Sequence, residues 1–106
     1  MVIKKLSIRQ EIKSAIRAVD PNAEVILFGS QARGEAGKDS DWDVLVLASV
    51  PMINLKDQEP FRNAIFQVMM DTDELISIIV RNRNTWKEKH AQTPLFQEIS
   101  QEGIIL

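Results

Sequence analysis

A short apolar run that ends in a glycine constrains the fold of this chain more than any other feature. Val25-Ile26-Leu27-Phe28 is too short and too uniformly apolar for a surface helix, and Gly29 follows it directly. A run of this kind predicts a strand that is buried on both faces and lies in the middle of a sheet. The 106 residues have room for one hydrophobic core. The sequence therefore predicts a single domain, residues 1–106, built around this strand.

Helical and strand-like patterns alternate along the rest of the chain. Apolar residues at helical spacing follow Ser7 until Asp20-Pro21-Asn22, and two further apolar runs rich in valine, leucine and isoleucine are strand-like. The expected elements are helices at 7–19, from 57–60 to 70, at 85–90 and at 94–101, with strands at 25–28, 42–47 and 75–80. This order predicts an α/β (α+β) domain, with a small mixed twisted sheet of three to four strands and helices packed against it.

Composition excludes several classes of protein. With 13 basic against 15 acidic residues and a net charge of -2, the chain lacks the positive charge that binding to nucleic acid requires. The absence of cysteine excludes disulfides, thiolate–zinc sites and a cysteine nucleophile. No apolar run approaches the roughly 20 residues that span a bilayer. We therefore expect a soluble, cytoplasmic protein without a membrane or nucleic-acid partner.

The loop after the first strand has the composition of a phosphate-binding site. A strand that runs into Gly29-Ser30 and a short helical turn presents free backbone N–H groups, which suit phosphate oxygens. The loop is not a P-loop, because Glu35 stands where that motif requires lysine. Arg33 and Lys38 lie within the loop and are either further phosphate contacts or ordinary solvated cations.

Two acidic residues follow the loop at strand spacing. Asp41 and Asp43 are one residue apart, which places both side chains on one face of a strand, roughly 7 Å apart. They could be solvated charges at the start of the strand, but two like charges on one face repel each other unless a cation lies between them. Mg²⁺ takes oxygen ligands and retains substrate phosphates among them, so we expect a magnesium site here.

Together these residues resemble a known signature. Gly29-Ser30, Ala32 and Gly34, followed by Ser40-Asp41-Trp42-Asp43, resemble the G-S-x-A-x-G…S-D-x-D pattern of minimal nucleotidyltransferases in the polymerase-β-like nucleotidyltransferase superfamily. The resemblance implies the nucleotidyltransferase fold and transfer of a nucleoside monophosphate, AMP by expectation, from an NTP to a hydroxyl group of a protein or small molecule. It implies catalytic and metal-binding roles for Asp41 and Asp43, in a site for two Mg²⁺ ions. The expected nucleotide-binding residues are Gly29, Ser30, Arg33, Lys38 and Ser40.

One position departs from the family pattern. Catalytic members carry a third carboxylate on a neighbouring strand, and Ser77 stands where we expect it, unless a different register brings Asp73 or Glu74 to that place. The second metal ion should then bind weakly. Members of the family are often paired with a helical HEPN-domain protein, so the expected partners are an NTP and a HEPN-type protein or a second copy of the chain. The alternative function is a catalytically weakened, nucleotide-binding antitoxin module that acts by association.

The remaining large side chains have structural interpretations. Both tryptophans and the apolar residues of the long helix are expected in the core, and His90 is expected at the surface. The apolar C-terminal segment is either the last layer of the core or a docking surface. The residues concerned are Trp42, Trp86, Phe61, Phe66, Met69 and Met70, and in the C-terminal segment Leu95, Phe96, Ile99 and residues 104–106.

Overall fold

The computed structural model describes residues 7–35, 37 and 40–106, without the side chain of His90. Four strands form one sheet in the order β3-β2-β1-β4, in which β1 pairs antiparallel with β2 and β4, and β2 pairs parallel with β3. The elements are α1 (Ile8–Val19), β1 (Glu24–Phe28), α2 (Ser30–Arg33), β2 (Trp42–Ala48), α3 (Leu55–Thr72), β3 (Ile76–Asn82), α4 (Arg83–His90), α5 (Pro94–Glu102) and β4 (Ile104–Ile105). The predicted mixed sheet, with β1 in its interior, is confirmed.

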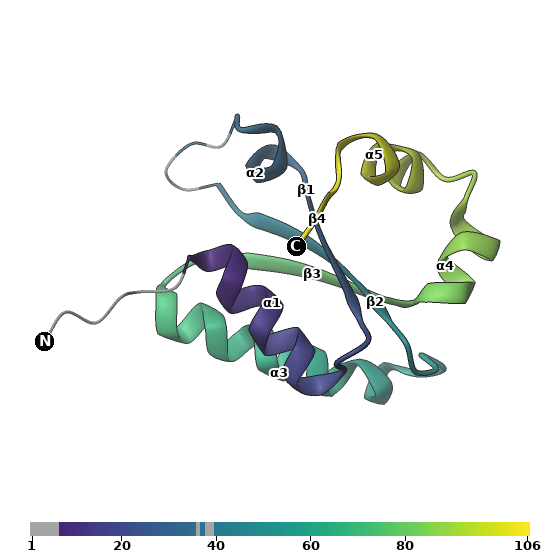
Figure 1. The fold of residues 1–106 in the computed structure, drawn as a ribbon, viewed down its shortest axis with the longest axis horizontal. Helices are drawn as coiled ribbons and strands as arrows, with labels where there is room; N and C mark the ends of the chain where they lie inside the picture. The colour runs from purple at the N-terminus through teal and green to yellow at the C-terminus, as the bar shows by residue number, and fades with distance from the viewer. Residues whose placement is uncertain (1–6, 36, 38–39) are drawn as a thin grey trace, which may run out of the picture.

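The helices cover the two faces of the sheet unequally. Figure 1 shows α1 and α3 side by side over one face, with α4 and α5 at the other side of the molecule. The larger core cluster joins α1 and α3 to the sheet through residues such as Ile12, Leu27 and Ile65, all fully buried. The smaller cluster on the opposite face contains Leu45 and Trp86. None of the helices within the described residues is long and apolar enough to cross a membrane.

The predicted first helix is confirmed, and its end is fixed by a buried carboxylate. Ser7 and Gln10 form a capping box at the start of α1. Asp20 ends the helix and is only 5% exposed. Its carboxylate accepts hydrogen bonds from the Ser49 backbone N–H (2.8 Å), the Ser49 hydroxyl (2.7 Å) and the Asn22 N–H (3.1 Å). These bonds tie the end of α1 to the end of β2.

Two element boundaries were predicted wrongly because side-chain caps outweigh the local composition. Helix α3 begins at Leu55 rather than at 57–60, since Asn54 and Asp57 form a capping box and the helix tolerates Pro60 in its second turn. Helix α4 begins directly after β3, because the Asn82 side chain accepts hydrogen bonds from the next backbone N–H groups; residues 82–84 are therefore not a break.

The assignment of Phe66 and Met70 to the core is also wrong. Phe66 is 58% exposed and Met70 is 64% exposed, whereas Phe61 is buried and Met69 partly buried. Only one face of helix α3, centred on Ile65, packs against the sheet. Phe66 lies about 100° further round the helix, so its side chain points away from the core.

The C-terminal apolar residues belong mainly to the core. Ile99 is buried, and Leu95 and Phe96 pack on the same cluster as Trp86, with 5.3 Å between the ring centroids of Trp86 and Phe96. Ile104–Ile105 adds the short edge strand β4 beside β1, an element that the sequence did not predict.

Candidate functional site

The glycine loop lies directly against the second aspartate of the acidic pair. Gly29 has φ 76° and ψ −159°, a conformation that is essentially restricted to glycine, and its carbonyl starts the four-residue helix α2. Phe28 is paired with Asp43 across the β1–β2 ladder. A Cβ atom on Gly29 would overlap Oδ2 of Asp43 and would lie 3.2 Å from its Cγ. The absence of a side chain at this position therefore lets the loop backbone contact the Asp43 carboxylate.

Asp43 is a partly buried carboxylate in a negative environment. Burial raises the pKa of Asp43, and the charges of Asp41 and Glu98 raise it further, while Arg33 lowers it. No hydrogen-bond donor among the described residues contributes to stabilising its charge. Asp41 is exposed and precedes the strand rather than lying within it. Two neighbouring carboxylates that repel each other suit a hard divalent cation, which Asp41 and Asp43 could hold together.

Ser77 occupies the neighbouring position on the next strand. Asp43 is aligned with Ser77 in the parallel β2–β3 ladder, so the two side chains share one face of the sheet. Trp42 points to the opposite face, where its indole Nε1–H donates to Glu74 at 3.2 Å. Glu74 thus lies on the side away from Asp43. Within the described part of the chain, no three acidic or histidine side chains gather as a metal site.

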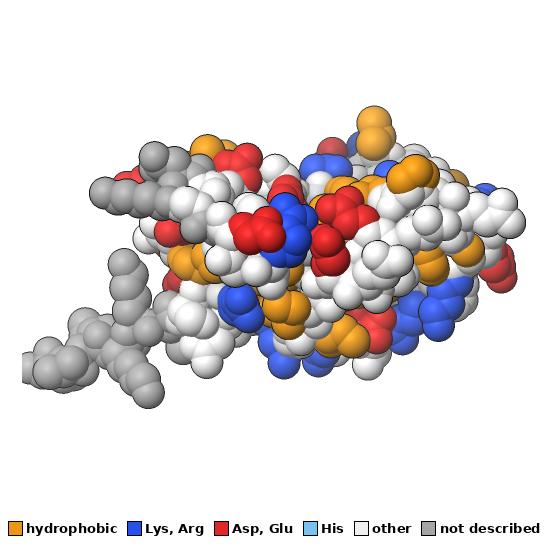
Figure 2. Space-filling model, turned by 90° about the horizontal axis from the view of Figure 1, so that it is seen from above, with side chains coloured by type: hydrophobic (Ala, Val, Ile, Leu, Met, Phe, Trp, Pro, Cys, Tyr) orange, Lys and Arg blue, Asp and Glu red, His pale blue; other side chains and the backbone are white. Residues whose placement is uncertain are grey.

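Arg33 is held by three carboxylates instead of pointing freely into the loop. Its Nε lies 3.0 Å from Glu35, and its Nη1 lies 3.0 Å from Glu102 and 3.6 Å from Glu98. The hydrogen bonds to Glu35 and Glu102 raise the pKa of Arg33 above its usual value. This cluster joins α2 to α5. Figure 2 shows acidic and basic side chains gathered near the centre of the face that it views. The sequence did not identify the two α5 glutamates as neighbours of the loop.

A comparison with known proteins decides the family. Residues 8–93 match the family described as the nucleotidyltransferase domain. The chain belongs to this family. It is similar to MJ0141 of Methanocaldococcus jannaschii, named as a candidate protein adenylyltransferase, with 32% identity over 101 residues that cover 93% of this chain and 95% of that protein. The predicted resemblance to nucleotidyltransferases is therefore confirmed.

Solved structures share the nucleotidyltransferase fold. A crystal structure of a toxin–antitoxin with AMP-PNP superposes with a TM-score of 0.66 at 23% identity, covering 94% of this chain and 72% of that chain. A crystal structure of a mutant of the toxin–antitoxin MntA-HpeT superposes with a TM-score of 0.64 at 23% identity, covering 96% and 72%. At this level of identity the likeness establishes the fold.

The other predicted nucleotide-binding residues are Ser30, Ser40 and Lys38. Ser30 is the first residue of α2, where backbone N–H groups have no partner within the helix. Ser40 accepts the Gly37 N–H at 2.9 Å with its hydroxyl, and its carbonyl accepts Gln31 Nε2 at 3.2 Å, so it orders the loop. Lys38 lies outside the described residues.

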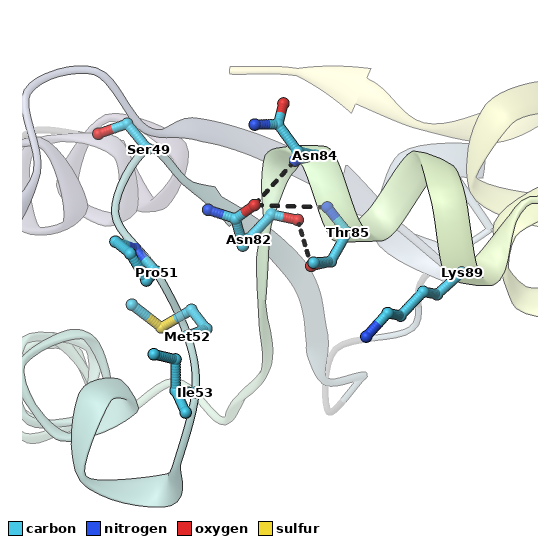
Figure 3. A pocket seen from close by; sticks show the side chains of 8 residues that line it. All are labelled: Ser49, Pro51, Met52, Ile53, Asn82, Asn84, Thr85 and Lys89. Carbon is cyan, nitrogen blue, oxygen red and sulfur yellow. Dashed lines mark hydrogen bonds between the residues drawn. The ribbon is translucent and has the colours of Figure 1, made fainter.

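A hollow of about 530 Å³ lies at the end of β2 and the start of α4, away from Asp43. Figure 3 shows the side chains that line it. Residues of the β2–α3 loop and of α4 line it, including Ile53 and Lys89. Several of its polar groups already bind one another: Asn82 accepts the Asn84 and Thr85 N–H groups, and the Thr85 hydroxyl donates to the Asn82 carbonyl. Asn82 and Thr85 are therefore engaged at the start of α4, and this hollow is a weaker candidate site than the Gly29–Asp43 contact.

Proposed function

We propose that the chain is a Mg²⁺-dependent nucleotidyltransferase that transfers a nucleoside monophosphate, AMP by preference, from an NTP to a hydroxyl group of a partner protein. The observation that carries the proposal is the contact between the Gly29 backbone and the Asp43 carboxylate. It brings a loop suited to phosphate beside Asp43, and this carboxylate and Asp41 are the ones that we propose bind the metal. Membership of the nucleotidyltransferase family and the similarity to MJ0141 support the reaction class.

The roles of the residues follow from their chemistry. The backbone N–H groups at Ser30 would bind phosphate oxygens, and Asp41 and Asp43 would hold Mg²⁺. When bound, the ion neutralises charge on the phosphate oxygens and aligns the reacting atoms. In the transfer, the acceptor oxygen forms a bond to the α-phosphorus, the bond from that phosphorus to the pyrophosphate oxygen breaks, and one proton leaves the hydroxyl group.

The electrostatics of the site support a requirement for the metal. Arg33 is the described cation whose charge lowers the pKa of Asp43, and it is already engaged by Glu35, Glu98 and Glu102. Counting the described residues, a triphosphate would therefore approach a rim with more carboxylates than positive charges. Mg²⁺ bound with the nucleotide would supply the missing positive charge, so nucleotide binding should depend on the metal.

A second candidate function is favoured by Ser77. This serine is aligned with Asp43 where catalytic relatives are expected to carry a third carboxylate, and a neutral hydroxyl is a weak metal ligand. The chain would then bind an NTP but act mainly by association with a partner, as an antitoxin-like module. The toxin–antitoxin structures of the same fold support a protein partner, which we expect to be a helical HEPN-type protein.

Transfer of label from ATP tests the two candidates. The protein is incubated with ATP labelled in its α-phosphate, Mg²⁺ and a cell extract, and labelled protein bands are detected. Wild type should label a band and Asp43→Ala should not, while Ser77→Asp should label more strongly because it restores a third carboxylate. Label that persists in Asp43→Ala refutes the enzyme. If no variant transfers label but Mg-ATP still binds, the association function is supported instead.

A further inference from the structure

The exposed side chains that the core does not use lie together along one side of α3. Arg62, Phe66 and Met70 are exposed and fall within about a quarter of the helix circumference, and the exposed Asp73 follows them as the residue that caps the end of α3. We call these four residues the α3 stripe. A groove of about 520 Å³ separates the stripe from β3, and Phe66, Ser77 and Ile78 are among the residues that line it. The stripe and the edge of β3 therefore form one continuous surface.

β3 is an edge strand that lacks the usual protection. It is the last strand of the sheet and spans seven residues, Ile76–Asn82, among which the described residues show pairing to β2 alone. Edge strands are usually shortened, or carry lysine, proline or inward charges, because their free backbone groups can pair with another chain. β3 contains neither lysine nor proline, and its single charge, Arg81, is near its end. This edge is therefore available for pairing.

The order of the side chains in the stripe identifies the partner. Along α3 the stripe reads basic, apolar, apolar, acidic, and its reverse reads acidic, apolar, apolar, basic. Placing two stripes antiparallel brings Arg62 of one copy against Asp73 of the other, and Phe66 against Met70. Such self-complementarity is the property of a two-fold interface, in which both subunits use the same surface. The same two-fold operation also sets two β3 edges antiparallel.

We propose that a second copy of this chain docks on this surface, through antiparallel pairing of the two β3 edges and of the two α3 stripes. The exposed Phe66 and Met70 become buried in the dimer, which gives these large apolar side chains a partner. The charges at each end fix the register. Dimerisation is measured by sedimentation, so its test does not depend on whether the chain transfers nucleotides.

Sedimentation equilibrium of charge-reversed variants tests the dimer. Wild type should sediment as a dimer. Arg62→Asp and Asp73→Lys should each weaken dimerisation about tenfold or more, because each places like charges against each other twice in a two-fold interface. Mixing these two variants in equal amounts should restore a dimer, because each copy then supplies the charge that the other requires. Arg17→Asp, a charge reversal on the exposed face of α1, is the matched control and should stay dimeric.

Three results would overturn the proposal. Wild type could be monomeric at every concentration. This result would overturn the proposal even if the surface were found to bind a different protein. The dimer could persist in both single variants, which would place the interface elsewhere. The mixture could stay monomeric although both variants unfold cooperatively at the wild-type temperature. Restoration in the mixture can arise only from folded variants, so it separates loss of the interface from loss of the fold.

Discussion

Replacing Gly29 by alanine should damage the fold and the site through one contact. The backbone conformation at Gly29 is essentially restricted to glycine, which adds about 1–3 kcal/mol of strain for alanine. The new Cβ would also overlap the Asp43 carboxylate, and overpacking of this kind typically costs a further 1–3 kcal/mol, roughly. We therefore expect Gly29→Ala to lower the free energy of unfolding by about 2–6 kcal/mol, out of the roughly 5–15 kcal/mol of a typical domain.

Gly34→Ala is the matched control, because Gly34 also has a positive φ of 73°, but no described atom beyond its chain neighbours lies within 4 Å of the place that a Cβ would take. Backbone strain alone should cost about 1–2 kcal/mol there. Urea unfolding followed by tryptophan fluorescence measures both variants. When Asp43 is also replaced by alanine, Gly29→Ala should lower the free energy of unfolding by less, because only the backbone strain at residue 29 remains. Equal costs for the two glycines, unchanged by Asp43→Ala, would refute the contact.

Further predictions concern charge. The pKa of Asp20 is lowered overall: burial raises it, but hydrogen bonds outweigh that effect. Asp20 therefore stabilises the fold at neutral pH and loses this contribution as the pH falls, so Asp20→Ala should cost about 2 kcal/mol at neutral pH and less in acid. Burial raises the pKa of Asp43, so its contribution is present in acid and is lost as the pH rises. Asp43→Asn should therefore be more stable than wild type at neutral pH but not in acid. Urea unfolding at neutral and acid pH measures the stability of both variants. If Asp20→Ala and Asp43→Asn changed the free energy of unfolding in the same direction at neutral pH, the two pKa directions would be contradicted. Glu98→Gln should tighten Mg-ATP binding several-fold in calorimetry, because it removes one of the carboxylates that engage Arg33 and a negative charge near Asp43. The same change at the exposed Glu88 should leave the affinity unchanged. Equal affinities of the two variants would show that Glu98 is not coupled to the site.

The parts of the fold that depend on local sequence were predicted well. The Val25–Phe28 run, the glycine after it and the helical spacing before it determine β1, α2 and α1, since each rests on neighbouring residues alone. The alignment of Ser77 with Asp43 agrees with the place that the resemblance to nucleotidyltransferases gave this residue on the neighbouring strand.

The features that were missed depend on contacts between distant residues. Periodicity places Phe66 on a helix but cannot say which side of that helix the sheet will cover. Glu102 meets Arg33 across 69 residues of sequence. The acidic pair Glu98 and Glu102, spaced one helical turn apart, was the only signal in the sequence that α5 presents charge to a partner.

Calorimetric titration with ATP tests the central claim most directly, because Asp41 and Asp43 are proposed to bind the nucleotide through Mg²⁺. Wild type should release or absorb heat on addition of ATP when Mg²⁺ is present and should show little binding when the metal is removed with a chelator. Ser30→Ala should weaken the binding and Asp43→Asn should abolish it while the protein remains folded. Binding of ATP with the same affinity in the presence and absence of Mg²⁺ would contradict the account.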